Sequence, residues 1–280
     1  MSKSLNDIGV LITRAAHQQT EIESLIEKEG GTPYSVPLIK IVSPESWESA
    51  DSAISELESF DWILFTSVNG VDGFWGRVKQ SGKNINQLSS KKIAAVGSKT
   101  RKRLEDIGLE VSLQPKKFDG DNLLKLINNE QINKKRILFP GAEYGREQLI
   151  NGLVNVGASV ISVPVYRTIP NDDVNSEKLI SLFVDGDIQI VTFFSPSTFK
   201  VFLNNLPQEI IEKTINKLVA VAVVGSTTSK YVNGLGFKAE IVPEEHTSFG
   251  LIEAMKSWAK SSGVLDSGRK TPKLSYTLKA

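Results

Sequence analysis

The sequence contains no cysteine, only two histidines and no long hydrophobic run. Without cysteine the chain cannot form a disulfide, a thiolate zinc site, an iron–sulfur cluster or a cysteine nucleophile. Because His17 and His246 are the only imidazoles, and no carboxylates stand at a ligand spacing around them, we expect no metal site. The longest apolar run, residues 218–224, is about a third of the length that crosses a bilayer.

Charge of one sign is also missing, because 33 Lys and Arg residues balance 32 Asp and Glu residues and leave a net charge of +1. A chain without a basic surplus has no global field that attracts nucleic acid or an anionic membrane. Near the start, only Val10 to Ile12 form an apolar core, which is too short for a secretory signal peptide. We therefore expect a cytoplasmic monomer with neither nucleic-acid nor membrane partners.

Three common active-site motifs are absent as well. No G-x-S-x-G elbow supports a serine hydrolase, and no GK[ST] sequence supports a nucleoside triphosphate site. Gly70, Gly73 and Gly76 stand three apart, which does not fit the dinucleotide-binding pattern G-x-G-x-x-G. The sequence thus gives no support for nucleotide chemistry.

The chain does contain a duplication, and this duplication is interrupted. Residues 61–127 align with residues 189–255 at an offset of 128, and residues 30–41 align with residues 157–168 at an offset of 127. Matching pairs in the longer alignment include Phe65 and Phe193, Ser67 and Ser195, Gly97 and Gly225, and Gly108 and Gly236. The order of short, long, short and long units indicates one domain that was duplicated.

Each unit alternates short apolar runs with amphipathic stretches, which indicates parallel βα units. Strands are expected at residues 9–13, 62–66, 93–96, 110–113, 136–139, 188–194, 218–224 and 238–242. Most helices between them end at a glycine, and Gly108, Gly157 and Gly236 are candidate left-handed caps.

Two stretches, residues 32–42 and 158–170, are β-rich and interrupted by prolines, which fits crossings between domains at sheet edges. If the chain crosses twice, one domain is discontinuous. After residue 260 the sequence loses its periodicity and becomes rich in Ser, Gly and Lys, so we expect residues 263–280 to be disordered.

Small polar residues occupy four junctions between a strand and a helix, at residues 67–70, 97–100, 195–198 and 225–228. A helix N-terminus offers unpaired N–H groups and a positive dipole end, so each junction can bind an anion. Ser, Thr and Asn are also ordinary helix caps, which explains any one junction without a ligand. Four junctions in a duplicated α/β chain favour a site for a polyanion at the carboxyl ends of the strands.

Six segments carry a resemblance to a known family. They are LITRA (11–15), FTSVNGV (65–71), AVGSKT (95–100), PVYRT (164–168), FFSPST (193–198) and VVGSTT (223–228). In this order and spacing they resemble uroporphyrinogen-III synthase over about residues 8–258. The resemblance implies two similar parallel-sheet α/β domains, residues 1–36 with 171–262 and residues 40–167, joined by a two-stranded linker with an active-site cleft between them.

The family acts on hydroxymethylbilane, a linear tetrapyrrole with an acetate and a propionate on every ring, and requires no cofactor. It expels the ring A hydroxyl, attacks through the substituted carbon of ring D and closes the ring with ring D inverted. Tyr166 matches the tyrosine proposed to assist the leaving hydroxyl. The same likeness and the four junctions predict these substrate-binding residues: Thr13, Arg14, Ser67, Asn69, Gly97, Ser98, Thr100, Ser195, Ser197, Thr198, Gly225, Ser226, Thr227 and Thr228.

A second interpretation stays open at this point. A two-domain cytosolic protein that binds a tetrapyrrole or another small polyanion, without converting it, would use the same hinge and the same helix N-termini. The isomer formed from hydroxymethylbilane distinguishes an enzyme from such a binding protein.

Overall fold

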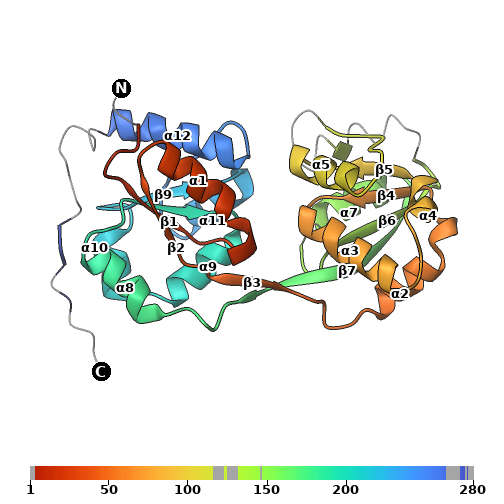
Figure 1. The fold of residues 1–280 in the computed structure, drawn as a ribbon, viewed down its shortest axis with the longest axis horizontal. Helices are drawn as coiled ribbons and strands as arrows, with labels where there is room; N and C mark the ends of the chain where they lie inside the picture. Colours follow the sequence, from red (N-terminus) through yellow and green to blue (C-terminus); the bar gives the residue numbers. More distant parts are fainter. Residues whose placement is uncertain are drawn as a thin grey trace. The chain divides into compact units, whose positions relative to one another are not determined.

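The computed structural model describes residues 4–115, 123–124, 132–145, 147–262, 272–274 and 276. The chain divides into two compact units, which we call unit 1 (Met1–Lys40 and Ile169–Ala280) and unit 2 (Ile41–Thr168). It passes from one to the other through β3 (Ile39–Val42) and returns through β7 (Ser159–Pro170), and these two strands are neighbours in one sheet (Figure 1).

Unit 1 contains a five-stranded sheet in the order β10-β9-β8-β1-β2, with every pairing parallel. Its strands are β1 (Gly9–Ile12), β2 (Thr32–Ser35), β8 (Ile190–Phe193), β9 (Ala220–Val223) and β10 (Ala239–Ile241). Its helices are η1 (Ala16–Gln18), α1 (Thr20–Lys28), α8 (Ser176–Val184), α9 (Pro196–Asn204), α10 (Gln208–Thr214), α11 (Ser226–Gly234) and α12 (Ser248–Ser261).

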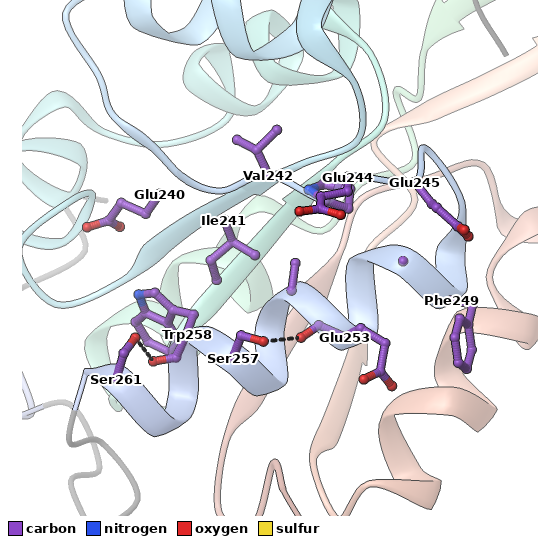
Figure 2. A pocket seen from close by; sticks show the side chains of 13 residues that line it. Glu240, Ile241, Val242, Glu244, Glu245, Phe249, Glu253, Ser257, Trp258 and Ser261 are labelled. Carbon is purple, nitrogen blue, oxygen red and sulfur yellow. Dashed lines mark hydrogen bonds between the residues drawn. The ribbon is translucent and has the colours of Figure 1, made fainter. Parts of the chain in front are cut away.

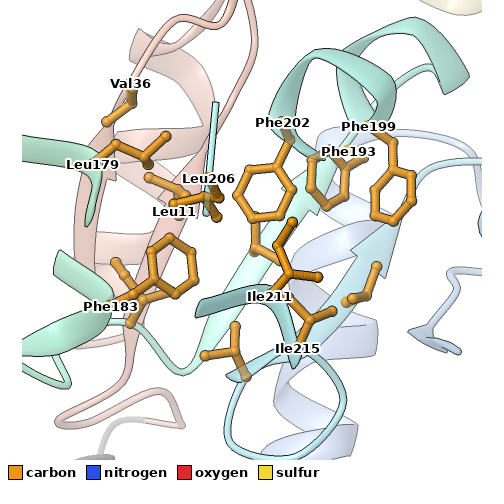
Figure 3. Close-up of a cluster of buried hydrophobic side chains, with 14 of the residues drawn as sticks. Leu11, Val36, Leu179, Phe183, Phe193, Phe199, Phe202, Leu206, Ile211 and Ile215 are labelled. Carbon is orange, nitrogen blue, oxygen red and sulfur yellow. The ribbon is translucent and has the colours of Figure 1, made fainter. Parts of the chain in front are cut away.

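The three central strands of unit 1, β1, β8 and β9, are buried on both faces because helices cover both sides of the sheet. In β1, the side chains alternate, so Leu11 joins one core with α8, α9 and α10, while Val10 and Ile12 join another with α1 and α12. Figure 3 shows the first of these cores, in which the rings of Phe193 and Phe199 meet edge to face with centroids 4.9 Å apart.

Unit 2 contains a sheet in the order β3-β7-β6-β4-β5, and the β4–β5, β4–β6 and β6–β7 pairings are parallel. Its remaining strands are β4 (Trp62–Phe65), β5 (Lys92–Ala95) and β6 (Arg136–Ala142). Its helices are α2 (Glu48–Ser55), η2 (Leu57–Ser59), α3 (Val68–Gln80), α4 (Asn86–Ser89), α5 (Ser98–Asp106) and α7 (Glu147–Asn155). Alternation along β4 sends Phe65 to the core with α2 and α3 and Leu64 to the core with α7.

The predicted parallel α/β class is confirmed, and so are the glycine caps. Gly108, Gly157 and Gly236 have φ of 88°, 91° and 84°, a conformation that is inexpensive only without a side chain. The strand predicted at residues 110–113 is wrong, because only one isolated bridge joins Leu113 to Ala94. The N–H groups of Ser112 and Leu113 both donate to the carbonyl of Ile93, which breaks the ladder that a strand requires.

Of residues 263–280, predicted to be disordered, the structure describes only residues 272–274 and 276. Leu274 N–H donates to the carbonyl of Val184 at 2.9 Å, and Leu274 and Tyr276 pack against the unit 1 core that includes α8. The two apolar side chains, two positions apart, give this short stretch a surface to bury that its polar composition concealed. Residues 263–271, 275 and 277–280 of the predicted segment lie outside the described residues.

Candidate functional site

The predicted catalytic tyrosine lies beside the N-terminus of α3 in unit 2. Ser67 caps this helix, and its Oγ accepts the N–H of Gly70 at 3.0 Å. The same Oγ lies 3.2 Å from the Oη of Tyr166 on β7, within hydrogen-bond distance. Both residues are half-buried, so the pair stays accessible to a ligand. The chain thus brings together two predicted residues that are 99 positions apart in the sequence.

Two glycines of α3 explain how its N-terminus comes so close to β6 and β7. A Cβ placed on Gly73 would lie 2.4 Å from the carbonyl oxygen of Val165, the residue before Tyr166. A Cβ on Gly70 would lie 3.1 Å from the carbonyl oxygen of Pro140 in β6. At Gly73 only glycine permits this approach of backbone to backbone, and at Gly70 a side chain would require the neighbouring backbone to shift by a few tenths of an ångström. Gly70 and Gly73 therefore allow the close helix–sheet packing that holds Ser67 against Tyr166.

The second junction of unit 2 is the start of α5, which follows β5. Gly97 has φ of 92° and forms the N-cap without a side-chain hydrogen bond. A Cβ at Gly97 would meet nothing within 4 Å, so the left-handed backbone, and not crowding, requires glycine here. Ser98 is exposed and Thr100 is buried. A ligand can therefore meet the Ser98 hydroxyl and the backbone amides of this first helical turn.

In unit 1, α9 begins with a compact set of hydroxyls. The Oγ of Ser195 accepts the N–H of Thr198 at 3.3 Å and lies 2.9 Å from Ser197 Oγ and 2.8 Å from Thr198 Oγ1. Pro196 occupies the first turn, where the missing N–H costs no helical hydrogen bond. Ser197 is exposed and Thr198 is buried, so the outer serine is the side chain that faces solvent.

The fourth junction, at the start of α11, repeats the geometry of the α5 junction. Gly225 has φ of 94° and is the N-cap, while Ser226 and Thr227 are exposed and Thr228 is buried. His246, one of the two histidines of the chain, lies against this loop, since a Cβ on Gly225 would be 3.6 Å from its Nδ1. No local pattern pointed to this proximity, because 21 residues separate the two positions.

Arg14 and Thr13 follow β1 and have different environments. Thr13 is fully buried, and its Oγ1 donates to the carbonyl of Thr192 at 2.6 Å, so we assign this hydroxyl to the sheet and not to a ligand. The guanidinium of Arg14 lies over the ring of Phe194, 4.1 Å from its centroid. Burial lowers the pKa of Arg14, and the nearby Glu21 carboxylate opposes that shift.

Three further predicted residues, Thr100, Thr198 and Thr228, are buried as well. A ligand at these junctions would meet the neighbouring amides before these side chains. Asn69 is half-buried in the first turn of α3, near the Ser67 cap. Within each unit the two junctions follow adjacent parallel strands, β4 and β5 or β8 and β9, which places both helix N-termini at one edge of the sheet.

A separate pocket of about 770 Å³ lies in unit 1, between β10 and one face of α12 (Figure 2). Among the described residues, no Lys or Arg lines it, whereas four glutamates do: Glu240, Glu244, Glu245 and Glu253. A ligand that carries many carboxylates would be repelled there. The pocket is therefore a poor candidate for a polyanion, in contrast to the helix N-termini at the strand ends.

The described part of the chain contains neither a candidate metal cluster nor a candidate membrane-spanning helix. No group of three or more His, Cys, Asp or Glu side chains in this part of the chain lies close enough to hold a metal ion. None of the helices in the described ranges is long and apolar enough to cross a membrane.

Comparison with known proteins gives a consistent result. The sequence model of the family described as "Uroporphyrinogen-III synthase HemD" matches residues 20–253. The uroporphyrinogen-III synthase of Synechococcus elongatus is 28% identical over 256 residues, which cover 90% of this chain and 96% of that protein. The uroporphyrinogen-III synthase of Chlorobaculum parvum is 27% identical over 236 residues, covering 84% and 92%.

Solved structures agree on the fold. A crystal structure of a substituted uroporphyrinogen III synthase from Thermus thermophilus has a TM-score of 0.62 at 19% identity and covers 91% of this chain and 99% of its own. The uroporphyrinogen-III synthetase of Helicobacter pylori has a TM-score of 0.57 at 17% identity, covering 89% and 98%. At these identities the likeness shows a shared architecture only.

Proposed function

Because the chain belongs to the uroporphyrinogen-III synthase family, we propose that it closes the linear tetrapyrrole hydroxymethylbilane into a ring and inverts ring D as it does so. The observation that carries the proposal is the contact between Ser67 Oγ and Tyr166 Oη, 3.2 Å apart at the N-terminus of α3. This contact places a phenol in a fixed position at the carboxyl edge of a parallel sheet, where α/β proteins bind their ligands.

The hydroxyls of Ser67 and Tyr166 lie within hydrogen-bond distance, and either of them can be the donor. The N–H of Gly70 donates to Ser67 Oγ, and the serine hydroxyl hydrogen can in turn be donated to Tyr166 Oη. In the mechanism that we propose the serine donates, so the phenolic hydrogen of Tyr166 is available to the hydroxyl that leaves ring A. Each bond in such a chain polarises the next, and the positive end of α3 adds to the effect.

In this mechanism Tyr166 acts as a general acid. It donates a proton to the departing hydroxyl, which leaves as water and gives a cationic azafulvene at the ring A methylene carbon. The substituted carbon of ring D attacks this methylene carbon to form a spiro intermediate, and the bond from the same ring D carbon to the ring C methylene then breaks. The unsubstituted carbon next to the nitrogen of ring D bonds to the ring C methylene, which closes the macrocycle with ring D inverted, and the proton that this carbon loses restores the phenol. Holding the two terminal rings close together and excluding water favour this route over direct closure.

The substrate's carboxylates match the helix N-termini. The amides at the starts of α3, α5, α9 and α11, together with the exposed hydroxyls of Ser98, Ser197, Ser226 and Thr227, offer donors without formal charge. Arg14 adds one cationic group. Because the donors are spread over many amides, a chain of nearly zero net charge can bind a polyanion.

Turnover of freshly prepared hydroxymethylbilane tests the proposed function. After oxidation of the products, chromatography separates porphyrin isomer III from isomer I, which forms by spontaneous closure without inversion. We expect isomer III to predominate with the native chain and isomer I with the heat-denatured chain. If isomer I alone forms, at the rate of spontaneous closure in buffer without protein, the result would favour a binding protein over an enzyme.

A further inference from the structure

The mechanism above uses Arg14 only as a cationic group and assigns no role to its contact with Phe194 in unit 1. Arg14 follows β1 and Phe194 follows the adjacent strand β8, so both lie at the same edge of the sheet. The guanidinium carbon is 4.1 Å from the ring centroid. The Nε of Arg14 is buried and has no hydrogen-bond partner among the described residues, while Gln19 Nε2 fixes the backbone by donating to the Arg14 carbonyl at 2.7 Å.

The duplication provides an internal comparison for this pair. In unit 1, Val10 of β1 pairs with Ile190 of β8, and in unit 2, Ile137 of β6 pairs with Trp62 of β4. By this register β6 is the counterpart of β1, and β4 is the counterpart of β8. Counting forward from these residues, Gly141 stands where unit 1 has Arg14, and Thr66 stands where unit 1 has Phe194. Neither member of the pair is present in unit 2. The arginine and the aromatic ring therefore occur together in unit 1, and unit 2 has neither at the corresponding positions.

The chemistry of the pair fits a carboxylate. A guanidinium that stacks on an aromatic face keeps the N–H groups at its edge free for two parallel hydrogen bonds to a carboxylate. The ring also restricts the rotamers of the long arginine side chain, which reduces the entropy lost when a ligand binds. Phe193, its neighbour, is buried in the core, whereas Phe194 is only half-buried at the edge where Arg14 lies.

We propose that Phe194 is a positioning residue that holds the Arg14 guanidinium in place for one carboxylate of the substrate. Unit 1 then binds one acetate or propionate through a charged side chain, in addition to the backbone amides that both units offer. This inference rests on the proposed function, since it takes hydroxymethylbilane as the ligand.

A double-mutant cycle tests the proposal. Phe194→Thr installs the residue of the repeat-related position, Arg14→Met removes the cation, and Phe194→Tyr keeps the ring. We expect Phe194→Thr to raise KM for hydroxymethylbilane about 5- to 20-fold with kcat within about twofold, and Phe194→Tyr to restore the native KM. In the Arg14→Met background, Phe194→Thr should change KM less than about twofold, because there is no guanidinium left to position.

Two controls keep the result specific. Lys79→Met removes another cation from an aromatic ring, that of Trp75 on α3, and should leave KM unchanged. Phe194→Leu keeps an apolar side chain without a ring and should show the same rise in KM of about 5- to 20-fold, so the test still holds if the threonine variant fails to fold.

The outcomes separate this inference from the proposed function. A native KM in Phe194→Leu and Phe194→Thr, or an equal rise in KM with and without Arg14, would overturn the positioning role while native turnover still supported the enzyme. Absence of isomer III from the native chain would overturn the proposed function and this inference with it.

Discussion

Replacing Gly73 by alanine tests whether close helix–sheet packing holds the proposed catalytic pair together. The added Cβ would lie 2.4 Å from the carbonyl oxygen of Val165, a backbone atom that cannot rotate away. Restoring an ordinary contact requires α3 to move by about 1 Å from β7, since such carbon–oxygen contacts normally exceed about 3.4 Å. Val165 precedes Tyr166, so the displacement falls directly on the Ser67–Tyr166 contact.

Gly76→Ala is the matched control, because its Cβ would meet nothing within 4 Å on the same helix. Alanine is favoured over glycine in a helix interior by about 1 kcal/mol, and this gain is shared by both variants. Overpacking costs about 1–3 kcal/mol, so Gly73→Ala should be less stable than Gly76→Ala by about that amount. Urea denaturation followed by tryptophan fluorescence measures the difference in the free energy of unfolding.

Turnover should follow the same order. We expect Gly73→Ala to lower kcat for hydroxymethylbilane about 3- to 30-fold, because a longer Ser67–Tyr166 distance leaves the phenol less well oriented. Gly76→Ala should keep native turnover. Equal stability of the two alanine variants, together with native turnover by both, would refute the link between glycine packing and the catalytic pair.

Three other changes give expected outcomes. Tyr166→Phe should lower kcat about 10- to 1000-fold and the free energy of unfolding by less than about 1.5 kcal/mol. The control Tyr34→Phe, on β2, should leave turnover unchanged. A native kcat in Tyr166→Phe would show that the tyrosine only packs. Gly225→Ala should cost about 1–2 kcal/mol of stability in thermal unfolding, through its φ of 94° and not through a clash, and an unchanged midpoint would contradict this. The hydrogen bond from Lys135 lowers the pKa of Asp61 below its ordinary value of 3.8. The ionised carboxylate therefore stabilises the fold at pH values above 3.8, and this stabilisation is lost as the pH falls through the lowered pKa. Asp61→Asn should therefore flatten the acid limb of the stability curve, and parallel limbs for variant and native chain would show that the ion pair contributes nothing.

The sequence alone determined the class of fold and the places where helices begin. Strand–helix junctions are local signals, since a cap such as Ser67 or Ser195 and a left-handed glycine such as Gly225 depend on a few neighbouring residues. The duplication reinforced these signals by repeating them in a second copy. The prediction of a strand at residues 110–113 was wrong because the N–H groups of Ser112 and Leu113 share the carbonyl of Ile93, and no local sequence pattern indicates this sharing.

Tertiary structure decided which predicted side chains a ligand can reach and which groups lie together. Thr13 and Thr228 carry the same hydroxyl as Thr227, yet the first two are buried and the third is exposed. The contact of Ser67 with Tyr166 joins positions 99 residues apart. The stacking of Arg14 on Phe194 likewise joins residues from different βα units. Such distances depend on strand order and on how closely each helix packs against its sheet, and both follow from contacts between segments that are remote in the sequence.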